Sequence, residues 1–172
     1  MGIPIIRSIR GTGTFEGADA MWINPQTVIL GRGLRTNDEG AAQVTSTLNE
    51  MGVDVIQVDL PVGTMHLMGM LRIVDYNLAI SQSYRLVHRG VDALKEHGLN
   101  TVYIPDEDEA SDNKALNFVT IAPREILMVA GNPITQAFYE GLGITCHVVE
   151  LNELVKAAGA IGCLSGILER EK

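Results

Sequence analysis

Three stretches of the chain share one succession of apolar runs and turn residues. Each opens with two β-rich runs separated by turn residues, which are Asn24-Pro25, Asp75-Tyr76-Asn77 and Pro123-Arg124. Each continues with apolar residues at helical spacing and closes with a short apolar segment led by a glycine. Turn residues between β-rich runs predict a hairpin, and apolar residues three or four apart predict an amphipathic helix. The pattern therefore predicts strand, strand, helix and strand, three times over.

The glycines that open the closing segments mark the period of this pattern. Gly52, Gly98 and Gly143 lie 46 and 45 residues apart, a spacing typical of stacked or radial repeats. We expect each glycine to end a helix in the left-handed conformation, and Asn132 to cap the third helix before Pro133. The predicted fold is a single α/β domain, 1–172, with ββαβ repeats at about 18–60, 66–107 and 115–151.

Both ends of the chain are predicted to fall inside a repeat. Residues 2–9 resemble the glycine-led closing strands, and residues 161–168 resemble an opening strand. This arrangement is expected for part of a closed ring of repeats, of which an N-terminal portion is missing. Because an open ring exposes apolar strand edges, we expect the chain to form a homo-oligomer or to associate with the missing N-terminal part.

Composition and charge narrow the range of partners and compartments. Lys and Arg number 13 against 21 Asp and Glu, giving a net charge of −8, so a nucleic-acid partner is not expected. Every apolar stretch is broken well before the roughly 18 residues that span a bilayer, so no membrane association is expected either. No targeting signal is visible, and Cys146 and Cys163 are too few for a disulfide framework. The sequence therefore predicts a cytoplasmic protein.

Several other patterns point to no cofactor or metal. The segments 11–17 and 31–37 lack the third glycine of a dinucleotide-binding loop. The acidic run 106–109 lacks the spacing of a calcium loop and is expected to be a solvated loop. His147 beside Cys146 has no second ligand pair nearby, so no zinc site is predicted.

A different group of polar residues lies at the junctions between repeats. Glu16 and Asp19, His66, and Cys163 each stand in a glycine-containing segment, and equivalent junctions of a radial repeat converge on its axis. Paired carboxylates bind the planar, permanently cationic guanidinium group, and a cysteine thiolate attacks its carbon. A histidine protonates the departing amine and then activates water. The combination predicts a site for chemistry on a guanidino group.

Each of these residues also has a purely structural interpretation. By residue type alone, Cys163 is consistent with a small buried apolar side chain, and His66 with a core histidine whose hydrogen bonds are satisfied. Glu16 and Asp19 are consistent with turn caps, and Arg35 with a solvated helix start. Their joint placement at repeat junctions favours the functional interpretation.

With these residues in this order, the chain resembles the guanidino-group-modifying superfamily of amidinotransferases, arginine deiminases and dimethylarginine dimethylaminohydrolases. The segment FEGAD resembles the family's E-G-G-D motif, GRGLRTN its R-T-N segment, MHLMG its H-L motif and AGAIGCLSG its cysteine motif. The resemblance implies a pentein-type α/β propeller, of which about three of five units are present. It also implies a small-molecule guanidino substrate and no cofactor.

The same resemblance implies a role for each candidate residue. Cys163 would be the nucleophile, His66 the acid and base, and Glu16 a guanidinium anchor supported by Asp19. Arg35 would contact the α-carboxylate of the substrate. The covalent intermediate would be a thiouronium on the cysteine.

Two departures from the family pattern bear on the reaction. Met68 stands where deiminases and amidinotransferases usually have aspartate, and Gly162 stands where they often have histidine. Because dimethylarginine hydrolases also lack both residues, the sequence favours hydrolysis of arginine or an N-substituted arginine. The alternatives are an amidinotransferase that uses an amine acceptor, and a catalytically inactive or partner-completed fragment.

Overall fold

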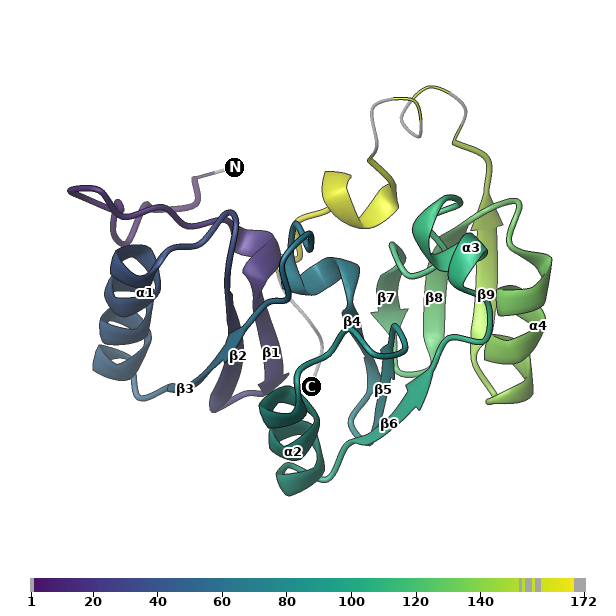
Figure 1. Cartoon of the computed structure of the whole chain (residues 1–172), viewed down its shortest axis with the longest axis horizontal. Coiled ribbons are helices and arrows are strands. Elements are labelled where there is room, and N and C mark those ends of the chain that lie inside the picture. Colours follow the sequence, from purple (N-terminus) through teal and green to yellow (C-terminus); the bar gives the residue numbers. More distant parts are fainter. Residues whose placement is uncertain (1, 152, 154–155, 157–158, 169–172) are drawn as a thin grey trace. The chain divides into compact units, whose positions relative to one another are not determined.

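A computed structural model describes residues 2–151, 153, 156 and 159–168, and Figure 1 shows its elements. The chain forms two compact units. The first unit contains Met1–Met70 and Tyr84–Gly98, and the second contains Leu71–Ser83 and Leu99–Lys172. In the part of the chain described, no helix is both long enough and apolar enough to cross a membrane.

The described residues form three three-stranded sheets, joined by helices and short 3-10 turns. The strands are β1 (Ala20–Asn24), β2 (Thr27–Arg32), β3 (Asp54–Asp59), β4 (Leu71–Asp75), β5 (Leu78–Ser81), β6 (Asn100–Tyr103), β7 (Val119–Ala122), β8 (Glu125–Val129) and β9 (Thr145–Val149). The helices are α1 (Asp38–Glu50), α2 (His88–Glu96), α3 (Glu107–Ser111) and α4 (Pro133–Gly141), and the 3-10 turns are η1 (Gly17–Asp19), η2 (Leu67–Gly69) and η4 (Ile161–Leu164).

All three sheets have the same topology. The first two strands form an antiparallel hairpin, and the third strand runs parallel to the second. A parallel pair needs a long crossover, and α1, α2 and α4 lie in the three crossovers. Each hairpin also shifts its register just before the turn, at Trp22/Asn24, Ile73/Asp75 and Thr120/Ala122. The three predicted ββαβ repeats are confirmed.

The predicted glycine positions also have the expected backbone conformation. Gly52, Gly98 and Gly143 have φ angles of 78°, 79° and 76°, a region that costs a residue with a side chain considerable steric energy. Each follows the last residue of a crossover helix by two positions and turns the chain toward the third strand. The repeat period visible in the sequence is therefore the spacing of these helix ends.

Burial is greatest in the middle strand of each sheet. Every residue of β2 except Arg32 is buried, as is the whole of β5, and strands that are buried on both faces typically consist of near-continuous apolar residues. The second unit has its own apolar core around Phe118 and Tyr139. Their rings pack edge to face, with 5.6 Å between the ring centroids. In the first unit, Val28, Ile29 and Leu30 are almost fully buried.

The predicted strands at the two ends of the chain are wrong. Residues 2–10 form no regular element, and residues 161–164 form the 3-10 turn η4, after which 165–168 form no strand. An extended segment becomes a strand only by hydrogen bonding to a neighbouring strand, and these segments pair with none among the described residues. A β-rich composition alone did not determine their structure.

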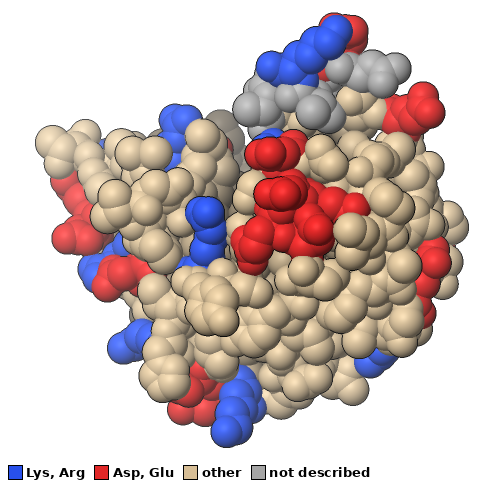
Figure 2. Space-filling view, turned by 45° about the vertical axis from the view of Figure 1, so that its right-hand side comes forward, with Lys and Arg blue, Asp and Glu red and all other residues tan. Residues whose placement is uncertain are grey.

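The acidic run is also not the solvated loop that its charge predicts. Asp106 caps α3 by accepting a hydrogen bond from the Glu109 backbone N–H at 2.8 Å. Glu109 is buried, and its carboxylate accepts hydrogen bonds from the backbone N–H groups of Ile134 at 3.1 Å and Thr135 at 2.7 Å. Glu107 and Asp108 remain exposed, and acidic side chains gather in one patch on the face that Figure 2 shows.

Glu109 therefore takes over the capping role that was predicted for Asn132. Asn132 does precede α4, but its side chain donates to the carbonyls of Val129 and Asn113 and makes no capping bond. The carboxylate from α3 instead satisfies two of the free N–H groups at the start of α4 and carries the charge that a helix N-terminus favours.

Replacing Glu109 with glutamine is expected to lower the free energy of unfolding by about 1 to 3 kcal/mol. The substitution removes the negative charge and leaves one helix N–H without a good acceptor in a buried place. Chemical denaturation of both proteins measures the difference. Asp108→Asn, on the exposed face of the same helix, is the matched control and should change stability by less than about 0.5 kcal/mol. Equal losses in the two variants would contradict the capping role.

Candidate functional site

The buried carboxylate of Asp19 joins three separate segments of the first unit. One oxygen accepts a hydrogen bond from the backbone N–H of Leu67 at 2.9 Å, and the other accepts from the hydroxyl of Thr36 at 2.6 Å. Asp19 and Thr36 have no exposed surface. Since an unpaired buried carboxylate is costly, these bonds fix η1, the segment after β2 and the start of η2 against one another.

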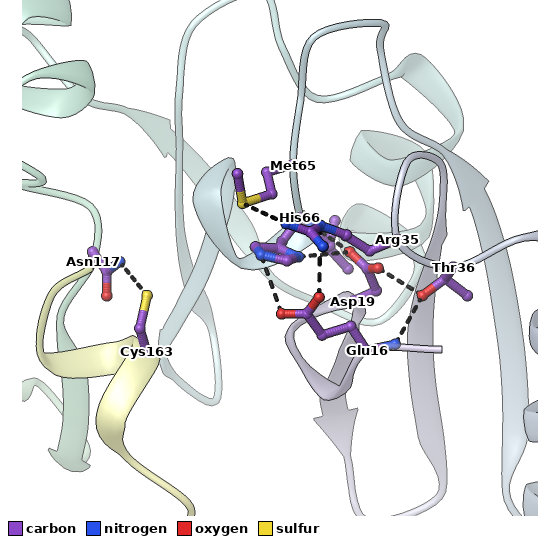
Figure 3. A network of polar contacts seen from close by, with 9 residues as sticks. Glu16, Asp19, Arg35, Thr36, Met65, His66, Asn117 and Cys163 are labelled. Atoms are coloured by element: carbon purple, nitrogen blue, oxygen red, sulfur yellow. Dashed lines mark hydrogen bonds and ion pairs between the residues drawn. The ribbon is translucent and has the colours of Figure 1, made fainter. Parts of the chain in front are cut away.

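His66 lies directly before Leu67 and is held beside both predicted carboxylates. Its Nε2 is 3.3 Å from Oε1 of Glu16, and its Nδ1 is 4.0 Å from Oδ1 of Asp19 (Figure 3). The imidazole is only 16% exposed, and its Nδ1 has no hydrogen-bond partner among the described residues. His66 is thus not a core histidine with satisfied hydrogen bonds.

Glu16 lies between His66 and a guanidinium group. Its Oε2 is 3.9 Å from Nε of Arg35, and the Glu16 side chain keeps 46% of its surface exposed. The Arg35 guanidinium also contacts Sδ of Met65 at 4.0 Å. The Glu16 side chain does not cap η1, so its carboxylate is available to solvent as well as to His66 and Arg35.

The segment that carries Glu16 is positioned by the residues after Arg35. The Thr36 hydroxyl accepts a hydrogen bond from the Glu16 backbone N–H at 3.3 Å. Asn37 caps α1 by accepting from Gly40 N–H at 2.9 Å, and the same oxygen accepts from Thr14 N–H at 3.0 Å. The Arg35-Thr36-Asn37 segment therefore connects α1 to the chain on either side of Glu16.

Cys163 lies in the second unit, in η4. Its thiol is exposed, while the preceding Ile161 and Gly162 are buried, and Ile161 packs with Val129 and Ala160 in a small apolar cluster. Cys163 is therefore not a buried apolar side chain. The side-chain N–H of Asn117 donates a hydrogen bond to its Sγ at 3.0 Å (Figure 3).

Arg72 on β4 supports this contact from the interior of the second unit. Its Nε donates to the carbonyl of Leu116 at 3.0 Å, its Nη2 lies 3.5 Å from Oδ1 of Asn117, and its guanidinium stands over the Phe118 ring at 5.7 Å. Burial lowers the pKa of Arg72 to about 10, and the nearby Cys163 acts in the opposite direction. The guanidinium remains charged at neutral pH.

Among the predicted residues, Glu16, Asp19, Arg35 and His66 thus lie together in the first unit, and Cys163 lies in the second. The sequence patterns assign no role to Thr36, Asn117 or Arg72. Thr36 lies inside the GRGLRTN segment, whereas Asn117 and Arg72 lie within the repeats and belong to no motif. Within the described part of the chain, no three His, Cys, Asp or Glu side chains are arranged to hold a metal ion.

Comparison with known proteins identifies the family. A family model described as arginine deiminase matches residues 3–91 and 78–170. The chain therefore belongs to the arginine deiminase family.

A curated relative and two solved structures extend this result. The chain is 28% identical over 160 residues to N(G),N(G)-dimethylarginine dimethylaminohydrolase of Pseudomonas aeruginosa, covering 93% of this chain and 58% of the relative. A mutant of the Pseudomonas aeruginosa enzyme complexed with citrulline is similar in structure, with 26% identity, a TM-score of 0.66, and coverage of 83% of this chain and 51% of that one. The chain thus spans little more than half the length of these relatives.

The second structure confirms the fold class at lower identity. SxtG, an amidinotransferase from Microseira wollei, matches with a TM-score of 0.74 and 13% identity, over 88% of this chain and 46% of that one. The predicted pentein-type α/β fold and the resemblance to the guanidino-group-modifying superfamily are therefore confirmed.

Replacing Thr36 with valine is expected to lower the free energy of unfolding by about 1 to 3 kcal/mol, because a buried oxygen of Asp19 would lose its hydrogen bond. Thr36→Ser retains the hydroxyl and is the matched control, with a smaller expected loss. Urea denaturation of the three proteins provides the comparison. Serine and valine variants of equal stability would show that the bond to Asp19 contributes little.

The two cysteines are expected to differ in reactivity with iodoacetamide. Burial, with a further contribution from Glu140, raises the pKa of the Cys146 thiol to about 11. Because the thiolate is the reactive form, Cys146 should stay unmodified at about pH 8 and react only as the pH approaches 11. Exposed Cys163 should be modified first. Mass spectrometry of the peptides resolves the two sites, and equal modification of both at about pH 8 would contradict this expectation.

Proposed function

We propose that the chain carries catalytic residues of a guanidino-group hydrolase that acts on arginine or an N-substituted arginine. The observation that carries this proposal is the 3.3 Å contact between His66 Nε2 and Glu16 Oε1, next to the buried Asp19, in a chain of the arginine deiminase family. A partly exposed carboxylate can bind a guanidinium cation. An imidazole beside it can then move a proton to or from a nitrogen of that cation.

In the proposed reaction the Cys163 thiolate gives an electron pair to the central guanidinium carbon. The carbon–nitrogen bond to the departing amine then breaks, and His66 supplies the proton with which the amine leaves as ammonia or an alkylamine. A thiouronium remains on the sulfur. Water, deprotonated by His66, adds to the same carbon, the carbon–sulfur bond breaks, and the thiolate is restored with a ureido product.

The remaining residues have binding and supporting roles in this proposal. Glu16 holds the guanidinium through charge-assisted hydrogen bonds, and Arg35 binds the carboxylate of the substrate. Asp19 acts indirectly, because both of its oxygens accept hydrogen bonds from Leu67 and Thr36 and hold His66 beside Glu16. We propose a small-molecule substrate for the site and no cofactor for the reaction.

Hydrolysis is preferred to amidino transfer on the basis of the relatives. The 28% identical relative is a dimethylarginine dimethylaminohydrolase, whereas the likeness to the amidinotransferase, at 13% identity, shows the fold alone. Met68, two residues after His66, and Gly162, before Cys163, are the positions at which the sequence departs from deiminases and amidinotransferases.

The test is formation of a ureido product from arginine, N-methylated arginines and agmatine, with and without glycine as an acceptor. Cys163→Ala is expected to lower the turnover rate at least about a thousandfold, because it removes the attacking atom. Cys146→Ala is the matched control and should retain turnover within about twofold, since the thiol on β9 takes no part in the reaction.

Each outcome of this assay bears on the proposal. Product without glycine, lost in Cys163→Ala, supports hydrolysis through this cysteine. Formation of guanidinoacetate when glycine is present, with no ureido product in its absence, would show that the reaction is amidino transfer and not hydrolysis. Full activity in Cys163→Ala, or no product from any of these compounds, would overturn the proposal.

A further inference from the structure

Cys163 has a polar neighbour that the proposed reaction does not use. The side chain of Asn117, which precedes β7, reaches the thiol through its N–H group at 3.0 Å. Asn117 is partly buried, and its own backbone N–H is bonded to the carbonyl of Lys114 at 2.8 Å. The donor is therefore held in place by the chain around it, while the sulfur that it contacts is exposed.

Arg72 determines which end of the Asn117 amide faces the sulfur. A guanidinium group can only donate hydrogen bonds, so the amide oxygen must face Arg72 Nη2, 3.5 Å away, and the amide N–H groups must face Cys163. Arg72 is itself fixed by the Leu116 carbonyl and the face of the Phe118 ring. The result is a directed sequence of contacts from a charged guanidinium, through an amide, to a thiol.

The residue before the cysteine leaves room for this arrangement. A Cβ atom at Gly162 would lie 2.1 Å from Arg72 Nη2 and 2.6 Å from Asn117 Oδ1. Glycine therefore allows the backbone of η4 to approach both side chains closely enough for the next residue to meet the amide.

We propose that Asn117, oriented by Arg72, is a positioning residue for the Cys163 thiol. Its N–H holds the sulfur in one orientation and favours the negatively charged sulfur, since hydrogen bonds to charged acceptors are stronger than those to neutral ones. Cys163 and Tyr139 are the titratable groups that act electrostatically on Arg72. The assignment rests on the proposed role of Cys163 as nucleophile and adds the residues that prepare it.

The experiment measures the thiol directly and needs no substrate. The rate of iodoacetamide modification of Cys163 is followed by peptide mass spectrometry between about pH 6 and 10, in the full chain. Asn117→Asp has nearly the same shape but places a negative charge beside the sulfur. Asn117→Ser removes the amide without adding charge. Asn113→Asp makes the same chemical change at an exposed asparagine of the same unit and is the matched control.

In Asn117→Asp, Cys163 is expected to react roughly three- to tenfold more slowly at neutral pH, with the rate profile moved to higher pH. The negative charge of the new carboxylate lowers the fraction of Cys163 that is thiolate at a given pH. A more basic thiolate is intrinsically somewhat more reactive, but this gain is smaller than the loss of thiolate. Asn117→Ser should show a smaller change in the same direction, and Asn113→Asp none. Cys146 reports on folding, because it stays unmodified at about pH 8 only while it keeps its partly buried place on β9. If Asn117→Asp exposes Cys146, the serine variant decides the question.

Turnover separates this inference from the proposed function. If the parent protein turns over a guanidino compound, Asn117→Ser should lower kcat roughly tenfold or more while KM changes by less than about twofold. Slower modification of Cys163 in variants of a protein without turnover would support the positioning role and overturn the proposed function. Unchanged modification rates in both Asn117 variants, with Cys146 still protected, would overturn the inference whatever the turnover.

Discussion

The arrangement of the first unit depends on a single buried charge. The Asp19 carboxylate is removed from water, and its cost is offset only because the Leu67 N–H and the Thr36 hydroxyl both donate to it. These partners come from segments 48 and 17 residues away in the chain. The same bonds that compensate the charge therefore fix the loop that bears His66 and the loop that bears Arg35. Loss of either partner would affect folding and the candidate site together.

The repeats and the site are built from different parts of the chain. The sheets use one hydrogen-bonding scheme three times, down to the irregularity before each hairpin turn. Glu16, Asp19, Arg35 and His66 all lie outside the strands, in η1 or in loops next to the 3-10 turns and α1. A rigid and repetitive framework thus presents residues from its connections, which can vary without disturbing the sheets.

The sequence predicted the repeated elements well because their signals are local. Turn residues, helical spacing and the glycines at 52, 98 and 143 act within a few residues of one another. The failures came where a distant partner decides the structure. Residues 161–168 have a β-rich composition but pair with no strand in the part of the chain that the structure describes. Glu109 lies in an acidic run that looks solvated, yet it is buried because the start of α4 needs an acceptor.

The candidate site shows the same division. Motif order placed Glu16, Asp19, Arg35 and His66 at junctions, and these four lie together in the first unit. That Asp19 uses both oxygens inside the protein, or that Asn117 meets Cys163 46 residues later in the chain, could not be predicted. Such contacts depend on which segments become neighbours in the folded chain. The periodic pattern of apolar residues predicts the elements of each repeat but not which side chains meet.

Gly162 also has a consequence for how this protein and its relatives can diverge. The space that a side chain would need at position 162 is already occupied by the Arg72 guanidinium and the Asn117 amide. A mutation at one of these positions therefore changes which residues are acceptable at the others. Chains with histidine before the cysteine should carry a shorter side chain at the position of Arg72. Correlated substitutions at the two positions, which are far apart in sequence, would then show that members of the family surround the same thiol with one of two alternative sets of side chains.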